Sequence, residues 1–580
     1  MQKSKFFCFL KKPYSVCVTY SMKSWILFVL LSVFFNCLQT KKSGFDLKQG
    51  GLPGIFLFGV SSGLISLGSS ASSDKTAPTV TVTNLKTKGT VETGILMGTS
   101  ADNVAVSKVE IQLNSGSYQT ATGTTSWTYK LPTTGWTGGN TNTINIKVTD
   151  TSGNVGTASL STLTKGLNSD VNGDGYNDIA VGAYGYNSNQ GRVYVFSGSA
   201  NGVTDSSAAN AGKIFNGYAS AAFGKNVLMA DFNNDGYGDL LVCSSVYTSS
   251  NNRGDIYYGS ATGLSSTPSL TFSPPSGSAT QFCYTIAAAD FNSDGYLDLA
   301  ISDGAVNPGI VYVYYGSSNG LSTTQSISIV DGSTTNEGVS MSAGDINGDG
   351  FPDLVMSNSI DSTVYIRFGS VNGLGAASTS FTGLLASQNV SLADLNGDGK
   401  QDLILGDPSA TSGASQGKVA VYLANGTTFN STASVTLDGD SSQYRFGSFL
   451  LGRDINGDGI NDLIISSDRA DLNSLADSGA VYIFNGCAST VICNGSGGAT
   501  AKSNLRIAGD SASLNLGSSV KVKDLNNDGF PELIITAVAG PGQMYIFQGS
   551  SAGFTATSNS SSSKTIAGQS TGSQFGASIN

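Results

Sequence analysis

The sequence of 580 residues contains no histidine. Histidine is the usual general base beside a catalytic serine or cysteine, and it is a frequent zinc ligand. Its absence excludes Ser-His-Asp and Cys-His catalysis, together with the zinc sites that need an imidazole. We therefore expect no enzyme of these classes.

Charged residues are also scarce. They make up 12% of the chain, against about 25% in an average soluble domain. The 40 acidic residues outnumber the 30 basic ones, so the formal net charge is −10. This balance argues against nucleic acid as a partner, because binding to phosphate needs a basic surface. The 74 glycines favour turns and strands over long helices.

The apolar run near the start of the chain, Trp25 to Phe35, has eleven residues, and spanning a bilayer needs about 20. With Lys23 before it and Cys37 soon after it, the run resembles a bacterial lipoprotein signal, in which the cysteine is lipidated and becomes the mature N-terminus. Phe35 stands where that signal has small residues, so a plain secretory signal stays open, as does the start site (Met1 or Met22). We expect residues 1–37 to be a leader for export, with a lipid anchor on Cys37.

Residues 38–76 carry no fold pattern and are interpreted as a tether. Residues 77–163 alternate apolar and polar side chains in short runs, for example Ile144-x-Ile146-x-Val148. Period two is typical of strands with one buried face. The segment VTDTSGN, which ends at Asn154, resembles the last strand and turn of bacterial Ig-like modules. A small Ig-like β-sandwich that acts as a spacer is therefore expected.

One motif recurs seven times from residue 168 to the end of the chain. It reads D-x-N-x-D-G-x-x-D and begins at Asp170, Asp231, Asp290, Asp345, Asp394, Asp454 and Asp524, the last copy closing with a glutamate. The wide spacing of the copies, 49 to 70 residues by subtraction of these positions, indicates a propeller or a solenoid. A later strand in most repeats has an aromatic pattern, such as GRVYVF at 191–196. We expect these aromatics to pack between sheets rather than to stack on a ligand.

A Phe-Gly pair, or a variant of it, stands eight residues before several motifs, at Phe223-Gly224, Phe282-Cys283, Phe446-Gly447 and Leu516-Gly517. With the motif, these pairs make residues 168–580 resemble the FG-GAP repeats of integrin alpha subunits and related bacterial surface proteins. The repeats at Asp345 and Asp394 lack the pair. The resemblance implies an all-β fold, a seven-bladed β-propeller preceded by the small Ig-like β-sandwich.

The first motif has no Phe-Gly before it, whereas the chain ends in an orphan copy, FGASIN, that begins at Phe575. If Phe575 is counted as position zero, Asn580 is position five, residues 168 and 169 fill positions six and seven, and Asp170 is position eight. This is the spacing between the Phe-Gly pair and the motif in the other repeats. We therefore predict that the C-terminus supplies the strand that the first repeat lacks. This closes the ring and removes unpaired sheet edges.

The residue types of the motif are those that bind Ca²⁺, a hard cation that takes about six to eight oxygen ligands. Positions 1, 3 and 5 supply side-chain oxygens. Position 6 is always Gly, where a sharp turn needs a positive φ. Position 7 varies, as expected if it offers only its carbonyl, and position 9 restores a carboxylate that leads directly into a strand. In an EF-hand the closing acid stands at position 12 before a helix, so the pattern argues against EF-hands.

About seven Ca²⁺ sites are expected, with these ligands: Asp170, Asn172, Asp174, Tyr176 and Asp178; Asp231, Asn233, Asp235, Tyr237 and Asp239; Asp290, Asn292, Asp294, Tyr296 and Asp298; Asp345, Asn347, Asp349, Phe351 and Asp353; Asp394, Asn396, Asp398, Lys400 and Asp402; Asp454, Asn456, Asp458, Ile460 and Asp462; Asp524, Asn526, Asp528, Phe530 and Glu532.

Cysteines and one tripeptide need separate interpretations. Cys487 and Cys493 flank five residues, and a local disulfide is expected in an exported protein. Cys243 and Cys283 lie on predicted strands of adjacent repeats; we favour buried thiols over a bond, and the sequence leaves the choice open. The tripeptide at 253–255 spells RGD, but it falls where other repeats begin a strand, so we interpret it as structural.

These features predict an exported, calcium-binding, integrin-like β-propeller that binds a protein or a glycan at the cell surface and is not an enzyme. Calcium-propeller polysaccharide lyases and fungal lectins have similar repeats, so a calcium-dependent lectin and a polysaccharide-cleaving enzyme remain alternatives. In integrins the calcium loops lie on the face opposite the ligand. The resemblance therefore implies that the loops stabilise the fold and that the ligand surface lies on variable inter-strand loops.

The leader makes a first prediction. Metabolic labelling with a fatty acid should label the protein, and Cys37→Ser should abolish the label, because the thioether-forming sulfur is then absent. The readout is fluorography of the purified protein. An unlabelled wild-type protein would contradict the anchor.

Overall fold

The computed structural model describes residues 6–11, 14–19 and 74–580, except within 74–580 for residues 84, 86, 88–89, 133–134, 137–141, 247–251, 276–280, 305–308, 331–336, 359–362, 376–378, 382–388, 413–414, 427, 441–442, 489 and 551. Residues 1–74 and 75–580 form two separate compact units. In the first unit, β1 (Phe6–Lys11) pairs antiparallel with β2 (Tyr14–Thr19). The predicted signal core, Cys37 and the tether up to residue 73 lie outside the described residues.

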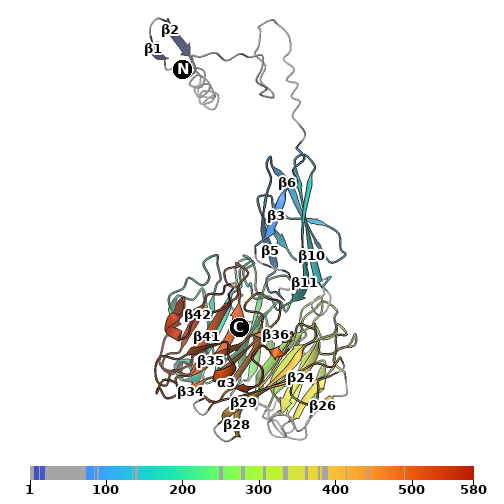
Figure 1. The fold of residues 1–580 in the computed structure, drawn as a ribbon, viewed down its shortest axis with the longest axis vertical. Helices are drawn as coiled ribbons and strands as arrows, with labels where there is room; N and C mark the ends of the chain where they lie inside the picture. Colours follow the sequence, from blue (N-terminus) through green and yellow to red (C-terminus); the bar gives the residue numbers. More distant parts are fainter. Residues whose placement is uncertain are drawn as a thin grey trace. The chain divides into compact units, whose positions relative to one another are not determined.

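Strands dominate the second unit (Figure 1). Its described α-helices, α2 (Tyr186–Asn189) and α3 (Ala499–Lys502), have four residues each. None of the helices in the described residues is long and apolar enough to cross a membrane. The prediction of an all-β fold is confirmed.

Residues 79–165 form two facing sheets. One has the order β4-β11-β10-β6-β7 and the other β3-β5-β9-β8. The strands are β3 (Thr79–Val82), β4 (Thr90–Val91), β5 (Ile95–Ala101), β6 (Val106–Leu113), β7 (Gln119–Thr120), β8 (Thr122–Gly123), β9 (Ser126–Lys130), β10 (Asn142–Asp150) and β11 (Val155–Lys165). Burial alternates strictly along β10, and its inward residues pack with Trp127 in one core. Period two in the sequence thus corresponds to strands with one buried face.

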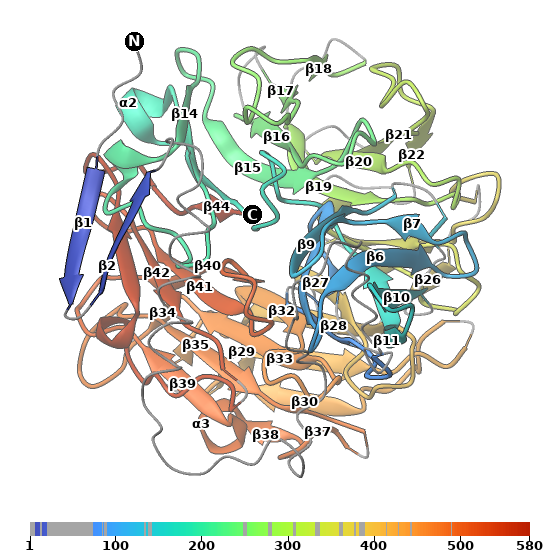
Figure 2. The same cartoon turned by 90° about the horizontal axis from the view of Figure 1, so that it is seen from above.

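Seven sheets follow, each with four antiparallel strands, and we call them blades 1 to 7 (Figure 2). The sheet of blade 5 has a fifth strand, β38 (Gly497–Gly498), at its outer edge. From the innermost to the outermost strand they are: blade 1, β44 (Ser578–Ile579), β12 (Ile179–Ala183), β13 (Arg192–Phe196) and β14 (Lys213–Asn216); blade 2, β15 (Phe223–Ala230), β16 (Asp239–Ser244), β17 (Arg253–Tyr257) and β18 (Leu270–Phe272); blade 3, β19 (Phe282–Ala289), β20 (Asp298–Asp303), β21 (Ile310–Tyr314) and β22 (Ile327–Ile329); blade 4, β23 (Glu337–Gly344), β24 (Asp353–Asn358), β25 (Thr363–Arg367) and β26 (Thr379–Phe381); blade 5, β27 (Asn389–Ala393), β28 (Asp402–Ser412), β29 (Ser415–Tyr422) and β30 (Val435–Asp438); blade 6, β32 (Phe449–Arg453), β33 (Asp462–Ser467), β35 (Ala480–Phe484) and β39 (Leu505–Ala508); blade 7, β40 (Leu516–Lys523), β41 (Glu532–Ala537), β42 (Gln543–Phe547) and β43 (Lys564–Ala567).

Each innermost strand contacts the innermost strand of the next blade, from β15 through β19, β23, β27, β32 and β40 to β44. The second and third strands of the blades are largely buried, and apolar clusters fill the space between neighbouring blades. Tyr194, Tyr314 and Tyr482 are fully buried, so the aromatic strand pattern is core packing, as the sequence predicted. In blade 6, for example, the Tyr482 ring lies edge-on to Phe446, with 5.6 Å between the ring centroids.

The Phe-Gly pairs begin the innermost strands and bury the aromatic ring between blades. Phe223, Phe282 and Phe446 are fully buried, and Gly224 and Gly447 take a positive φ. Cys283 occupies the same place with a φ of 65°. The first residue of the pair therefore fills the space between blades with its side chain, and the second adopts the left-handed backbone conformation.

Our preference for free thiols at Cys243 and Cys283 is wrong, because the two residues form a disulfide between blades 2 and 3. Their Cα atoms are 5.5 Å apart, within the usual range for a disulfide. Cys243 pairs across the strands with Gly254, and a side chain on Gly254 would meet the Cys283 sulfur. The glycine thus leaves room for the bridge. A second disulfide joins Cys487 and Cys493.

The C-terminus completes blade 1. Ser578 and Ile579 pair antiparallel with Gly182 and Val181 of β12, and the backbones of Asn580 and Ala180 exchange two hydrogen bonds of 2.8 and 3.0 Å. Phe575 is fully buried, and its ring lies 5.3 Å from that of Tyr194, centroid to centroid. The predicted closure of the ring by the C-terminal strand is confirmed.

Phe575→Ala should destabilise the whole ring, because its cavity opens beside the strand that closes it. We expect a loss of about 3–5 kcal/mol in the free energy of unfolding, measured by urea denaturation. Tyr218→Ala, at a side chain 45% exposed, is the control and should change it by less than about 0.5 kcal/mol. Equal effects of the two variants would contradict the closure.

Candidate metal-binding loops

The seven motifs form seven loops at the same end of the ring. Six of them join the innermost strand of a blade to its second strand, such as β15 to β16. In blade 1 the loop of residues 170–178 follows β11 of the sandwich instead, because the innermost strand comes from the C-terminus. The repeat and the ring together bring every motif to equivalent places.

Two positions of each loop have a left-handed backbone. The glycine at position 6 has a φ between 83° and 92° in all seven loops, which confirms the turn expected there. Position 4 also has a positive φ, and the sequence analysis missed it. Its residues are Gly173, Asn234, Ser293, Gly348, Gly397, Gly457 and Asn527. Glycine and asparagine tolerate this conformation best, so their presence at position 4 was the available signal.

The carboxylate at position 1 organises the turn. In the fifth loop, Asp394 accepts hydrogen bonds from the backbone N–H groups of Gly397, Asp398 and Gly399 at 2.7, 3.1 and 2.7 Å. The N–H of position 6 is bound in the same way in all seven loops, at 2.7 to 2.9 Å. Such bonds hold the carboxylate toward the centre of the loop.

Positions 3 and 5 bring their oxygens together at the open side of the loop. In the first loop the Asn172 amide donates to the Asp174 carboxylate at 2.9 Å, and Asp174 also accepts the N–H of Tyr176 at 2.9 Å. The same Asn-to-Asp contact occurs in five other loops. Since both side chains lie near the surface, they can approach an ion without rearrangement of the core.

The carboxylate at position 9 is buried and serves two backbone segments. Asp298 accepts the N–H of Phe291 at position 2 and the N–H of Gly316, which follows the third strand, both at 2.8 Å. The other Asp loops repeat this arrangement, with Gly198, Gly259, Gly369, Ala424 or Gly486 as the distant donor. In the seventh loop Gln548 donates its side-chain amide to Glu532 instead.

Position 9 therefore ties the loop to the turn after the third strand, which lies at the same end of the blade, a role that the sequence analysis missed. The signal was a Gly-Ser pair after the aromatic strand, as at Gly198-Ser199 and Gly316-Ser317. The carboxylates of positions 1, 5 and 9 do not all come within 4.8 Å of one another in any described loop. An oxygen that accepts one hydrogen bond still has a lone pair for an ion.

Burial raises the pKa of these acids. The pKa of Asp178, Asp298 and Glu532 rises to about 8, and that of Asp353, Asp402 and Asp462 to about 7. At position 1, burial raises the pKa of Asp170, Asp231 and Asp524 to about 6. The neighbouring carboxylates add to the rise in each loop, and the backbone N–H donors oppose it. Each loop thus gathers acidic groups whose charged form is costly, and Lys165 offsets part of this cost for Asp231 and Asp290.

The donor set of the loops fits a hard divalent cation. Every side-chain ligand offers oxygen, and soft donors are absent from the motif. In the seventh loop the buried Oδ1 atom of Asp524 has no hydrogen-bond partner, and an unpaired buried carboxylate oxygen costs free energy unless an ion binds it. Positions 1, 3, 5 and 9 with the carbonyl of position 7 are the residues that could hold the ion.

The sandwich reaches some of these loops. Lys130 donates to the backbone oxygen of Asp235 at 2.8 Å, and Asn168 donates to that of Gly236 at 3.0 Å. Arg453 and Glu92 form an ion pair of 3.0 Å. The first two of these contacts use the carbonyls of positions 5 and 6 of the second loop and do not involve the carbonyl of position 7.

The RGD tripeptide is not presented for recognition. It lies on β17, and the Asp255 carboxylate is fully buried, with an ion pair of 2.9 Å to Arg253 and a hydrogen bond of 2.7 Å from Thr271. Its interpretation as part of a strand agrees with this place in blade 2.

Comparisons with known proteins bear on the repeats. A model described as FG-GAP-like repeat matches residues 231–301, 345–405 and 394–465, and one described as FG-GAP repeat matches residues 164–196. Integrin alpha-3 of Cricetulus griseus is 34% identical over 160 residues, which cover 25% of this chain and 15% of that protein. Phosphatidylinositol-glycan-specific phospholipase D of Bos taurus is 36% identical over 153 residues, which cover 22% of this chain and 18% of that protein.

The chain thus spans less than a fifth of the length of these two relatives. Among solved structures, the V. cholerae biofilm matrix protein Bap1 is similar with a TM-score of 0.33 at 15% identity, over 70% of this chain and 81% of that one.

The raised pKa values predict a pH dependence in the presence of chelator. Between the unfolded value near 4 and the folded value of about 7, Asp353 binds more protons folded than unfolded, so its contribution to stability falls as the pH rises. The free energy of unfolding in EDTA should therefore be smaller at pH 8.0 than at pH 5.5. Asp353→Asn should reduce this difference by about 1 kcal/mol or more, measured by urea denaturation at both pH values. Parent and variant share every other titratable group. If the free energy of unfolding differed between the two pH values by the same amount in both proteins, the raised pKa of Asp353 would be contradicted.

Proposed function

We propose, from the FG-GAP repeats that this chain carries, that it is an exported, calcium-binding, integrin-like propeller protein that binds a protein or a glycan at the cell surface. In this proposal a lipid on Cys37 anchors the protein to the membrane, and the sandwich, interpreted as an Ig-like module, is a spacer. The relatives that match include integrin alpha subunits and phosphatidylinositol-glycan-specific phospholipase D, which supports a place outside the cell.

The observation that carries the calcium proposal is the sevenfold recurrence of one oxygen-donor loop. Each loop combines three carboxylates with an asparagine and the carbonyl of position 7, and neighbouring carboxylates raise one another's pKa. Like charges at this separation repel unless a cation lies among them. Bound Ca²⁺ would supply that positive charge.

The residues of the loop then have separate roles. Position 1 holds the turn, positions 3 and 5 approach the ion from the open side, and position 9 connects the ion to the end of the third strand through its backbone donors, as in Asp298 with Gly316. Calcium would therefore stabilise the end of each blade at which the loop meets the turn after the third strand. The ligand would bind elsewhere, on the connections that differ from blade to blade.

The proposal assigns the chain no catalytic activity. Several acids outside the loops are already paired: Asp468 with Arg445 at 2.8 Å, Asp438 with Lys418 at 3.5 Å and Asp255 with Arg253 at 2.9 Å. The similarity to the phospholipase covers 18% of that protein and is a similarity of repeats. A lectin differs from the main proposal only in its ligand, and a pocket lined by polar side chains on the rim of blade 6 favours a lectin.

Calcium removal should strongly destabilise the propeller. With about 1 mM Ca²⁺ and a Kd of about 0.1 mM, each site contributes about 1.4 kcal/mol and seven contribute about 10 kcal/mol. EDTA should therefore lower the melting temperature by about 10 °C or more, measured by calorimetry, and elemental analysis should find about seven Ca²⁺ per chain.

A matched pair of variants in blade 5 tests one site. Asp398→Ala should remove one Ca²⁺ per chain and lower the free energy of unfolding in 1 mM Ca²⁺ by about 1.4 kcal/mol. Asp438→Ala removes an acid outside the loops and should leave the calcium count unchanged. A protein that is purified without metal and has the same melting temperature in EDTA and in Ca²⁺ would contradict the calcium proposal.

A further inference from the structure

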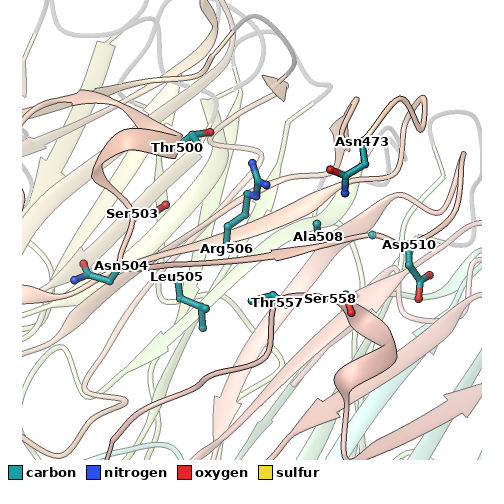
Figure 3. Close-up of a pocket in the computed structure, with 11 residues that line it drawn as sticks. Asn473, Thr500, Ser503, Asn504, Leu505, Arg506, Ala508, Asp510, Thr557 and Ser558 are labelled. Carbon is teal, nitrogen blue, oxygen red and sulfur yellow. The ribbon is translucent and has the colours of Figure 1, made fainter.

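A pocket of about 570 Å³ lies on the rim of blade 6, beside its outermost strand β39 (Figure 3). Six of its eleven lining residues carry a side-chain hydroxyl or amide: Asn473, Thr500, Ser503, Asn504, Thr557 and Ser558. Arg506 projects into the middle of the pocket and Asp510 lies at one end (Figure 3). The volume is in the range of small-molecule sites.

Part of the pocket wall belongs to a long connection of blade 6, which we call the excursion. Between the third and fourth strands, blade 6 has 20 residues, 485–504, whereas the other blades have 11 to 16, by subtraction of the strand ends. The excursion contains the short strands β36 (Gly486–Cys487), β37 (Val491–Ile492) and β38 (Gly497–Gly498), followed by α3. The Cys487–Cys493 disulfide links β36 to the turn after β37, and β38 pairs with β30 of blade 5. This segment is therefore held firmly on both sides.

The repeats themselves show that Arg506 is not needed for the fold. Arg506 pairs with Tyr482 in the middle of the outermost strand. In five other blades the residue at this register is a serine or threonine: Thr271, Ser328, Ser380, Thr436 and Thr565. Blade 1 has Ile214. A small side chain is thus sufficient at this position, and blade 6 alone places a cation there.

The charge of Arg506 is not neutralised by a close acid. Among the described residues, no carboxylate lies within ion-pair distance of its guanidinium. Its neighbour Tyr482 carries no charge that could pair with it: burial raises the pKa of that hydroxyl to about 12, and the nearby Arg506 guanidinium opposes the rise. Asp440 lies in the same region, and its carboxylate accepts the backbone N–H of Thr500 at 3.2 Å. The guanidinium keeps donors for an external anion.

We propose that this pocket binds an acidic saccharide unit, whose carboxylate is held by Arg506. Guanidinium groups bind carboxylates through two parallel hydrogen bonds. The hydroxyls of the sugar would meet the amide of Asn504, the hydroxyls of Ser503 and Ser558, and the carboxylate of Asp510. Asn504 has its side-chain oxygen bound to the N–H of Asn485 at 2.9 Å, which directs its amide donors away from that bond. The inference rests on the proposed binding function and names its ligand class.

The internal repeats supply the test variant. Arg506→Thr gives blade 6 the residue of Thr565 in blade 7, so the melting temperature in Ca²⁺ should not change measurably. The probe is a trisaccharide of galacturonic acid, titrated calorimetrically into the full chain in 1 mM Ca²⁺, with maltotriose as the uncharged comparison. We expect binding of the acidic sugar only, and a loss of about 10- to 100-fold in affinity in Arg506→Thr, because charged hydrogen bonds contribute about that factor.

Two controls keep the result specific. Arg469→Thr removes an exposed arginine of blade 6 outside the pocket and should not change the affinity. Arg506→Lys keeps the charge but loses the paired geometry, so its affinity should lie between those of the parent and Arg506→Thr.

The remaining outcomes overturn the inference. If the parent does not bind the trisaccharide, or if Arg506→Thr binds it equally well, the pocket is not the site. Binding of a glutamate-rich peptide but not of the sugar would show a peptide site. Calcium is counted on the same samples, so a chain with about seven Ca²⁺ and no sugar affinity loses this inference and keeps the proposed calcium function.

Discussion

In six of the seven loops, a buried carboxylate at the ninth position joins the loop to the turn after the third strand of the same blade. Its two oxygens accept backbone N–H groups from the start of the loop and from the turn after the third strand, as in Asp178 with Val171 and Gly198. The same burial that makes these bonds strong also raises the pKa of the acid. The architecture thus needs negative charge at the place where desolvation makes it costly. This conflict is the physical reason to propose a cation in each loop.

Closure of the ring imposes a second constraint. A ring of sheets has no free inner edge only if its last strand pairs with its first blade. The chain meets this requirement with Ser578 and Ile579, and Phe575 fills the interblade space that Phe223 and Phe446 fill elsewhere. The disulfide between Cys243 and Cys283 adds a covalent link between blades 2 and 3. Most contacts between blades are otherwise apolar, and they depend on the ring as a whole.

Repetition also separates residues that serve the fold from residues that do something else. Where seven equivalent positions hold the same chemistry, as at positions 1, 5 and 6 of the loops, the residue belongs to the common architecture. Where one blade departs from the others, the departure needs its own cause. Arg506 and the 20-residue excursion with its disulfide depart together in blade 6, and Arg506 and the end of the excursion line one pocket. Variation of this kind is the expected place for binding on a conserved scaffold.

Local patterns alone determined the all-β fold, the repeat and the closing strand, because each of these depends on periodicity and on counting along the chain. Alternation in β10, the spacing of seven motifs and the orphan copy at Phe575 are visible without coordinates. The loop ligands were likewise readable from residue types.

Three features required the tertiary structure: the second role of position 9, the Cys243–Cys283 bond and the pocket at Arg506. Each brings together residues more than 15 positions apart, for example Cys243 and Cys283, which are 40 apart. Whether such residues meet depends on how strands lie beside one another in three dimensions, and no local pattern encodes that distance.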